Sequence, residues 1–226
     1  IPREFLDPAW SHRATTADYY ALITSMDDLL GRLLARLEAD GRAEDTVVVF
    51  TSDHGDMLWS QGLLYKSVPY EESVQVPLIV RWPNGLPAGR VCDTLINTPD
   101  VFPTLAGLLG LPVPATVEGQ DLSAALRGEA GAPRPPSAFL SHYRSYTFRA
   151  DRPVPPWRGV RTERYTYAET EDRRPWLFFD NDADPFTLQE APPGGASLPE
   201  FQQRVAPAGA GLRARRAQLA GPLVLV

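Results

Sequence analysis

The stretch TVVVFTSDHG, residues 46–55, decides the fold of this chain. An apolar run, Val47–Phe50, comes shortly before Asp53, His54 and Gly55. A β-branched run without polar alternation is typical of a strand buried on both faces, as in a parallel sheet. Open α/β sheets bind ligands beyond the carboxyl ends of such strands, so Asp53 and His54 are predicted to lie at a ligand-binding edge. Gly55 is expected to let the backbone turn away sharply.

Helices and strands are predicted to alternate on both sides of this run. Residues 15–41 place apolar side chains at a 3.6-residue period, after a Thr15–Asp18 capping box and before Gly41 as the C-terminal glycine. The elements expected next are a second buried strand at Val76–Arg81, a third candidate strand at Asp93–Ile96, and a helix at Pro99–Leu109 with Thr98 as its N-cap. The alternation predicts an α/β fold with a largely parallel sheet sandwiched by helices.

The character of the chain changes near residue 130, at the proline-rich stretch 131–136. Aromatic-rich alternating segments follow at Ser137–Tyr143, Trp157–Thr170 and Trp176–Asp180; Arg161–Tyr167 has the period of an exposed strand, and residues 198–219 are expected to form a closing helix. We therefore predict two domains, an α/β domain at 1–130 and a small antiparallel-sheet subdomain with a terminal helix at 131–226.

The amino-acid composition argues against some classes of binding partner for this chain. The chain has 226 residues, of which 43% are hydrophobic, so it has enough apolar material for a packed core. Its formal net charge of -6 argues against nucleic acid or an anionic membrane as the main partner. No apolar run approaches the roughly 18 residues of a membrane span. A single cysteine, Cys92, allows no intrachain disulfide, and nothing in the sequence indicates the compartment.

The residue types at the strand end suit metal and anion chemistry. An Asp oxygen and a neutral His nitrogen are both metal ligands, and adjacent residues leaving a strand can converge on one ion. Lys66, the only lysine in the chain, follows thirteen residues after Asp53. A divalent cation and an ammonium in one pocket suit a tetrahedral oxyanion such as sulfate or phosphate. The residues alone leave other interpretations open: an Asp-His-Gly turn is often structural, and a lone lysine usually lies on the surface.

A series of segments along most of the chain stands in a specific order and spacing. The segments are Tyr19–Ala21, Leu29–Arg32, Thr46–Leu58, Lys66, Tyr70–Ser73, Val76–Val80, Asp100–Leu105, Gly119–Leu122, Arg161–Tyr165, Leu177–Asp180 and Asp184–Pro185. Together they resemble the sulfatase family. This resemblance implies an alkaline-phosphatase-like fold and a sulfuric ester hydrolase acting on a small-molecule sulfate ester.

The resemblance also implies roles for three residues. Asp53 matches a metal-ligand Asp, and His54 stands where family members carry Asn or His as the neighbouring ligand. The metal is expected to be Ca²⁺, with Mg²⁺ or Mn²⁺ in some relatives. Lys66 matches a catalytic lysine that contacts the sulfate. The expected reaction is nucleophilic displacement at sulfur through a covalent sulfo-enzyme intermediate.

Two departures from the family pattern bear on activity. The family's formylglycine nucleophile is made from Cys or Ser in Cys/Ser-x-Pro-x-Arg, which the surroundings of Cys92 do not match. The family places that motif and two acidic ligands ahead of the segment corresponding to Thr16. We therefore expect this chain to be the C-terminal part of the fold and to need the missing N-terminal half as its partner. We also expect the chain to be inactive alone. Where many members have Gly-x-His-Gly, residues 59–62 are Trp-Ser-Gln-Gly, and Gln61 cannot act as a general acid at neutral pH.

Two alternatives stand beside the sulfatase hypothesis. A phosphate or phosphonate ester hydrolase of the same superfamily would use the same Asp-His pair, since sulfate and phosphate esters share tetrahedral geometry. A truncated, non-catalytic protein that binds an anion or a partner through the retained fold is the third hypothesis.

Overall fold

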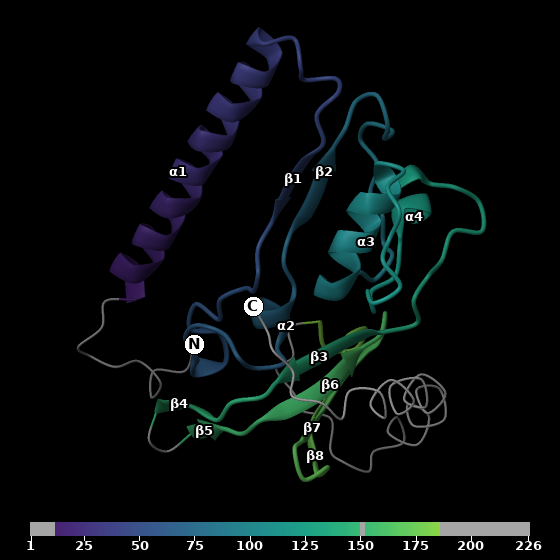
Figure 1. Cartoon of the computed structure of the whole chain (residues 1–226). Helices are drawn as coiled ribbons and strands as arrows, with labels where there is room; N and C mark the ends of the chain where they lie inside the picture. The colour runs from purple at the N-terminus through teal and green to yellow at the C-terminus, as the bar shows by residue number, and fades with distance from the viewer. Residues whose placement is uncertain (1–11, 150–151, 186–226) are drawn as a thin grey trace. The chain divides into compact units, whose positions relative to one another are not determined.

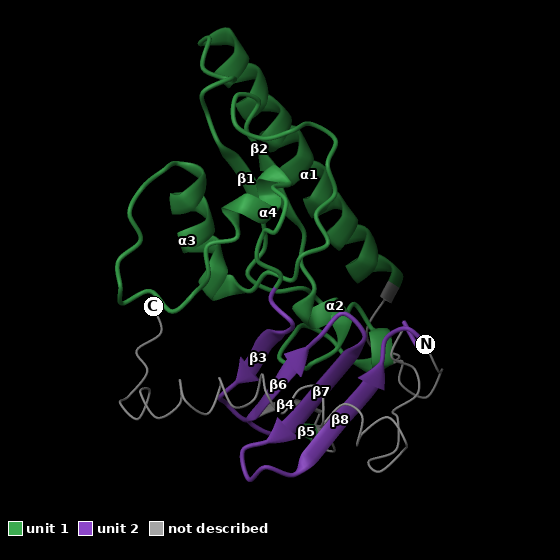
Figure 2. Cartoon of the chain, turned by 90° about the vertical axis from the view of Figure 1, so that its right-hand side faces the viewer, with its two compact units in different colours: residues 1–134, 147–154 green, residues 135–146, 155–226 purple. Residues whose placement is uncertain are grey.

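The structure is a computed structural model that describes residues 12–149 and 152–185 (Figure 1). The chain divides into two compact units, residues 1–134 with 147–154 and residues 135–146 with 155–226 (Figure 2). The elements are α1 His12–Ala39, β1 Val48–Thr51, the 3₁₀ turn η2 Ser60–Gly62, α2 Glu71–Val74, β2 Leu78–Arg81, α3 Thr98–Leu108, α4 Ser123–Arg127, β3 Ala138–His142, β4 Tyr146–Arg149, β5 Arg152–Val154, β6 Trp157–Arg161, β7 Tyr165–Thr170 and β8 Pro175–Asp180.

Helix α1 ends where the sequence predicts and begins earlier. Gly41 has a φ of 66° and donates its N–H to the Glu38 carbonyl at 3.0 Å, while the Arg42 N–H reaches the Leu37 carbonyl at 2.9 Å. These two bonds form a Schellman motif, which satisfies carbonyls of the last turn. The predicted cap at Thr15 is wrong, because the helix begins at His12 and Thr15 lies inside it.

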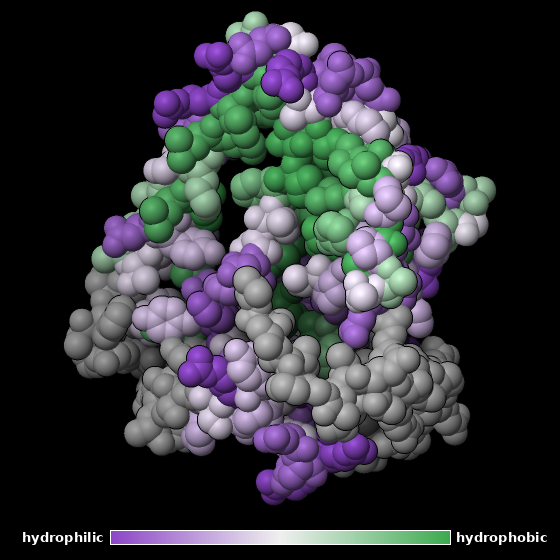
Figure 3. All heavy atoms as spheres, in the orientation of Figure 1, coloured by the Kyte–Doolittle hydropathy of each residue, from purple (hydrophilic) through white to green (hydrophobic). Residues whose placement is uncertain are grey.

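The apolar side of α1 is exposed within the described structure (Figure 3). Six of its large hydrophobic residues retain 42–63% of their accessible surface; they are Tyr20, Leu22, Ile23, Met26, Leu29 and Leu33. All but Tyr20 share one face of the helix, and we call these five residues the α1 stripe. A stripe with helical period normally packs against another element, so its exposure indicates a surface that needs a partner. No helix among the described residues has the length and apolarity needed to cross a membrane.

Strands β1 and β2 pair antiparallel, with Val48 opposite Arg81 and Thr51 opposite Leu78. The sequence indicated a parallel arrangement, which requires a crossover connection, usually a helix. The connecting residues 52–77 contain only the four-residue α2 and a 3₁₀ turn, so the chain returns beside β1 in the opposite direction. The predicted strand at Asp93–Ile96 is absent, although the α/β class itself is confirmed.

Helices α3 and α4 pack through a small polar network. Asn97 caps α3 in place of the predicted Thr98: its side chain accepts the Thr98 N–H at 2.8 Å, and Asp100 accepts the Asn97 N–H at 2.9 Å. Asp100 also accepts the Gln120 N–H at 2.8 Å. Buried Thr104 accepts the Leu122 N–H at 3.1 Å, which ties the start of α4 to α3.

The described part of the second unit contains the small antiparallel sheet that the sequence predicts, with four strands in the order β3-β6-β7-β8. Phe179 and Ala168 are fully buried, and the Tyr165 ring stacks on Phe178 with centroids 5.5 Å apart. The strand predicted at Arg161–Tyr167 is wrong, because residues 162–164 form the turn between β6 and β7. The helix predicted at 198–219 lies outside the described residues.

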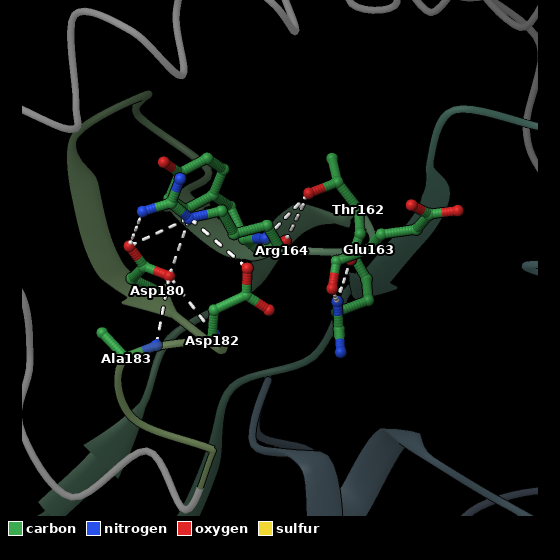
Figure 4. A network of polar contacts seen from close by, with 8 residues as sticks. Thr162, Glu163, Arg164, Asp180, Asp182 and Ala183 are labelled. Carbon is green, nitrogen blue, oxygen red and sulfur yellow. Dashed lines mark hydrogen bonds and ion pairs between the residues drawn. The ribbon is translucent and has the colours of Figure 1, made fainter.

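A polar network joins that turn to the end of β8 (Figure 4). Arg164 donates to both carboxylate oxygens of Asp180, from Nη2 at 2.7 Å and from Nε at 3.0 and 3.2 Å. The Ala183 N–H approaches Asp180 at 3.4 Å. The hydrogen bonds and charge of Arg164 hold the pKa of Asp180 below its usual value, so the pair stabilises the folded state when Asp180 is ionised.

We predict that Asp180→Asn lowers stability at pH 7 and that the difference from wild type shrinks at acid pH. The folded-state pKa of Asp180 is depressed, so its contribution is present above the unfolded pKa of about 4 and is lost as pH falls through the folded value. Urea unfolding between pH 7 and pH 2.5 measures this. Asp182→Asn, at an exposed neighbour of the same Arg164, is the control and is expected to change stability less. A wild-type advantage over Asp180→Asn that stays constant down to pH 2.5 contradicts the assignment.

Candidate metal and anion site

The turn after β1 organises the carboxylate of Asp53. The Ser52 hydroxyl donates to the His54 carbonyl at 2.7 Å, which closes the turn. Asp53 Oδ1 accepts the His54 N–H at 3.0 Å and lies 3.4 Å from the Ser52 hydroxyl. The loop's own groups thus engage Oδ1 and leave Oδ2 to face the His54 ring.

The His54 ring faces that second oxygen with an acceptor. Nδ1 lies 2.7 Å from the Gly55 carbonyl, which can only accept, so Nδ1 carries a proton. In the neutral ring, Nε2 then presents a lone pair, and it lies 3.5 Å from Asp53 Oδ2. Two acceptors facing each other repel unless a metal cation, or a proton on Nε2, lies between them. Donors about 2.0–2.5 Å from one ion lie roughly 3–3.5 Å apart at right angles, so the pair fits a metal ion.

The surroundings keep Asp53 ionised. Partial desolvation raises the pKa of Asp53. A positive charge on His54, present only when that ring is protonated, the backbone N–H groups of Asp53 and His54 and the Ser52 hydroxyl lower it, and the net effect is a lowered pKa. The Asp53 and His54 side chains are 85% and 38% exposed, so an ion can reach both. Within residues 12–149 and 152–185 no group of three or more His, Cys, Asp or Glu gathers to hold a metal.

The loop that follows folds over a small apolar core of its own. Met57 is fully buried, and Trp59, Leu63 and Val68 are nearly so. The Met57 N–H donates to the Tyr65 carbonyl at 2.6 Å, and the Trp59 N–H donates to the Leu63 carbonyl at 2.8 Å. The first of these bonds brings Tyr65 beside Met57, which lies three residues after His54, and Lys66 follows Tyr65 directly in the chain.

Lys66 itself is exposed between two residues of left-handed backbone, Tyr65 with φ 65° and Ser67 with φ 82°. Five of the six described non-glycine residues with positive φ fall between Leu58 and Ser67. Such conformations cost free energy and gather at functional sites. Within the described residues Lys66 makes no hydrogen bond or ion pair with Asp53 or His54. The structure therefore unites two of the three predicted site residues and places the third on the same loop.

Sequence reasoning missed the main reason for the glycine after His54. The φ of Gly55 lies outside the left-handed region, so the expected conformational freedom is not what the position requires. A Cβ on Gly55 would lie 2.0 Å from the Glu72 carbonyl oxygen, so the backbone of α2 occupies the space of a side chain. No sequence pattern reports such an approach between residues seventeen apart.

The α/β elements and the small antiparallel sheet agree with the alkaline-phosphatase-like fold of the similar solved structures. Residues 3–111 match the model of the sulfatase family, and residues 60–193 match that of the N-sulphoglucosamine sulphohydrolase C-terminal region. The chain belongs to the sulfatase family.

Three relatives illustrate the similarity. The chain is 37% identical over 172 residues to the ulvan-active sulfatase of Formosa agariphila, an alignment that covers 74% of this chain and 33% of the relative. BT4656 in complex with its substrate D-glucosamine-2-N,6-O-disulfate has a TM-score of 0.73 at 28% identity, covering 89% of this chain and 40% of that one. A phosphonate monoester hydrolase of Agrobacterium radiobacter has a TM-score of 0.74 at 27% identity, covering 92% and 42%. The chain spans about a third of the length of the curated relatives it matches.

We predict that Met57→Ala lowers the free energy of unfolding by about 2–4 kcal/mol, because Met57 is fully buried at the base of the site loop. Chemical unfolding of the purified protein measures this. Met57→Leu conserves volume and serves as the control, with an expected loss of less than about 1.5 kcal/mol. An equal and small effect of both substitutions contradicts a packed loop core.

Proposed function

We propose that the full-length protein is a metal-dependent sulfuric ester hydrolase. The observation that carries this proposal is the pair of facing acceptors, Asp53 Oδ2 and His54 Nε2, at the end of β1 in a sulfatase-family chain. The turn after β1 orients the pair through its own hydrogen bonds before any ion arrives.

Asp53 and His54 would hold the metal ion, which we propose to be Ca²⁺, with Mg²⁺ or Mn²⁺ as alternatives. The carboxylate suits all three ions, while an imidazole nitrogen favours a transition metal such as Mn²⁺ over Ca²⁺. When bound, the ion would polarise the sulfate oxygens, and the family's formylglycine would supply the nucleophile. Because Gly55 keeps the proton on Nδ1 of His54, Nε2 remains available as a ligand without the loss of a proton.

Lys66 would bind the sulfate group. An ammonium is a compact point charge with three donors, which suits an oxyanion that gains charge on its ester oxygen. Gln61 lies in η2 with φ 55°, on the same loop. Its amide is able to donate a hydrogen bond but supplies no proton, so the leaving group must gain its proton from another source.

The rest of the site would come from the preceding part of the protein. The α1 stripe is exposed in the described structure, and the matched relatives are about three times as long as the matched region. We propose that the N-terminal half of the fold covers the stripe and brings the nucleophile and the remaining acidic ligands to Asp53 and His54.

Activity measurements test whether the active site is divided between this chain and the rest of the full-length protein. The purified 226-residue chain is expected to show no turnover of 4-nitrophenyl sulfate, while the full-length protein hydrolyses it, because the described part of the chain supplies two proposed ligands, the lysine and no nucleophile motif. Initial rates of 4-nitrophenol release compare the two proteins. Clear hydrolysis by the 226-residue chain contradicts the proposed division.

Substitutions of Lys66 in the full-length protein test whether this residue binds the sulfate group. Lys66→Ala is expected to lower kcat/KM for the sulfate ester roughly 10²–10³-fold, as the loss of one donor to a developing anion does elsewhere. Lys66→Arg keeps the charge but not the compact geometry, and is expected to recover part of the loss. Unchanged kcat/KM in Lys66→Ala excludes Lys66 from substrate binding.

A phosphonate or phosphate ester hydrolase is the second candidate, favoured by the similarity to the phosphonate monoester hydrolase. Initial rates on 4-nitrophenyl sulfate, 4-nitrophenyl phosphate and phenyl phosphonate esters distinguish the two activities. We expect the sulfate ester to give the highest kcat/KM. D-glucosamine 6-sulfate belongs in the same panel, because the structure with a glucosamine disulfate is among the similar ones. A higher kcat/KM on a phosphorus ester favours the alternative.

A further inference from the structure

We infer that Gly55 is a positioning residue, which holds the Asp53–His54 pair against α2 and thereby sets the affinity of the site for its cation. The inference rests on the metal-binding role proposed above for the pair. It adds that a backbone contact with α2, outside the ligands themselves, controls how well they bind.

Both peptide groups of Gly55 are engaged, on opposite sides of the residue. Its carbonyl lies 2.7 Å from His54 Nδ1 and so orients the ring and sets its tautomer. Its N–H donates to the Ser73 carbonyl in α2 at 2.9 Å. One residue therefore links the imidazole of His54 to the backbone of α2 through two consecutive hydrogen bonds.

The contact between Gly55 and α2 leaves no room for a side chain. A Cβ at Gly55 would lie 2.0 Å from the carbonyl oxygen of Glu72 and 2.9 Å from its carbonyl carbon, with the Gln75 carbonyl oxygen at 3.5 Å. All three are backbone atoms, which cannot swing aside as a flexible side chain can. Since φ at Gly55 is not left-handed, the absence of a side chain is itself what the position requires.

Helix α2, which contacts Gly55, is held in place by its own first turn and by the strand that follows it. Ser73 is buried, and its N–H donates to the Tyr70 carbonyl at 2.9 Å. The chain then enters β2, whose first residue, Leu78, pairs with Thr51 at the end of β1. The β1–β2 pairing therefore holds the two ends of the segment 52–77 together, and the Gly55–Ser73 hydrogen bond links two points within that segment. An added side chain at residue 55 would push the turn and its two ligands away from α2.

The test compares two glycine substitutions in the full-length protein. Gly55→Ala is expected to weaken Ca²⁺ or Mn²⁺ binding at least about tenfold, the range seen when groups that orient metal ligands are altered. Gly119→Ala is the matched control: a Cβ there would lie 1.8 Å from the Pro99 carbonyl oxygen, an equally severe backbone clash that involves neither α2 nor the ligand turn. Isothermal titration gives the affinity, and thermal unfolding in EDTA gives the stability. Both variants are expected to lose stability, and only Gly55→Ala is expected to lose affinity.

The possible results separate the inference from the proposed function. If Gly55→Ala and Gly119→Ala bind the cation with the same affinity, whether that affinity is unchanged or reduced relative to wild type, the positioning role is wrong. Asp53→Asn is titrated alongside: if it binds the ion as tightly as wild type, the metal site itself is wrong; if it loses binding while Gly55→Ala does not, only the positioning role fails. A wild-type protein that binds neither ion contradicts both.

A measurement on the wild-type protein decides the matter even if Gly55→Ala does not fold. Hydrogen exchange is followed with and without the ion, over peptides that cover residues 53–55 and 71–75. Binding is expected to slow exchange in both segments, because the Gly55 N–H joins them. Slower exchange at 53–55 with no change at 71–75 overturns the inference.

Discussion

The backbone of α2 lies so close to Gly55 that no side chain fits between them, and the geometry of the site depends on this contact. The strand β1 delivers Asp53 and His54 to its carboxyl end, but a strand end alone leaves two side chains free to rotate. Hydrogen bonds within the turn orient the carboxylate, and the Gly55 carbonyl orients the ring. The contact with α2 then fixes the peptide that does the orienting.

The proposed division of the site rests on two features. Two acceptors face each other without a third ligand among the described residues, and an exposed apolar stripe runs along α1. The N-terminal half that we propose would account for both, because it would add ligands and cover the stripe. The metal pair does not by itself distinguish sulfate from phosphorus esters, because both are tetrahedral oxyanion esters. Under the proposed function, selectivity would depend on Lys66 and on the loop around Gln61.

The sequence predicts well what local pattern encodes. The apolar run Val47–Phe50 gives β1, and the rule for strand ends places Asp53 and His54 together. A local sequence pattern specifies neither the relative direction of two strands nor how closely two distant segments approach. For this reason neither the antiparallel pairing of β2 nor the approach of α2 to Gly55 was predicted. The alternation at Arg161–Tyr167 continues through a tight turn, and the periodicity alone therefore merged two strands into one.

The most direct test of the account is a crystal structure of the full-length protein grown with Mn²⁺, with anomalous scattering recorded above the manganese absorption edge. The account predicts an anomalous peak within about 2.0–2.5 Å of both Asp53 Oδ2 and His54 Nε2. An ordered Mn²⁺ elsewhere in the molecule with none at this pair, or a pair whose two acceptors have turned apart, would contradict it.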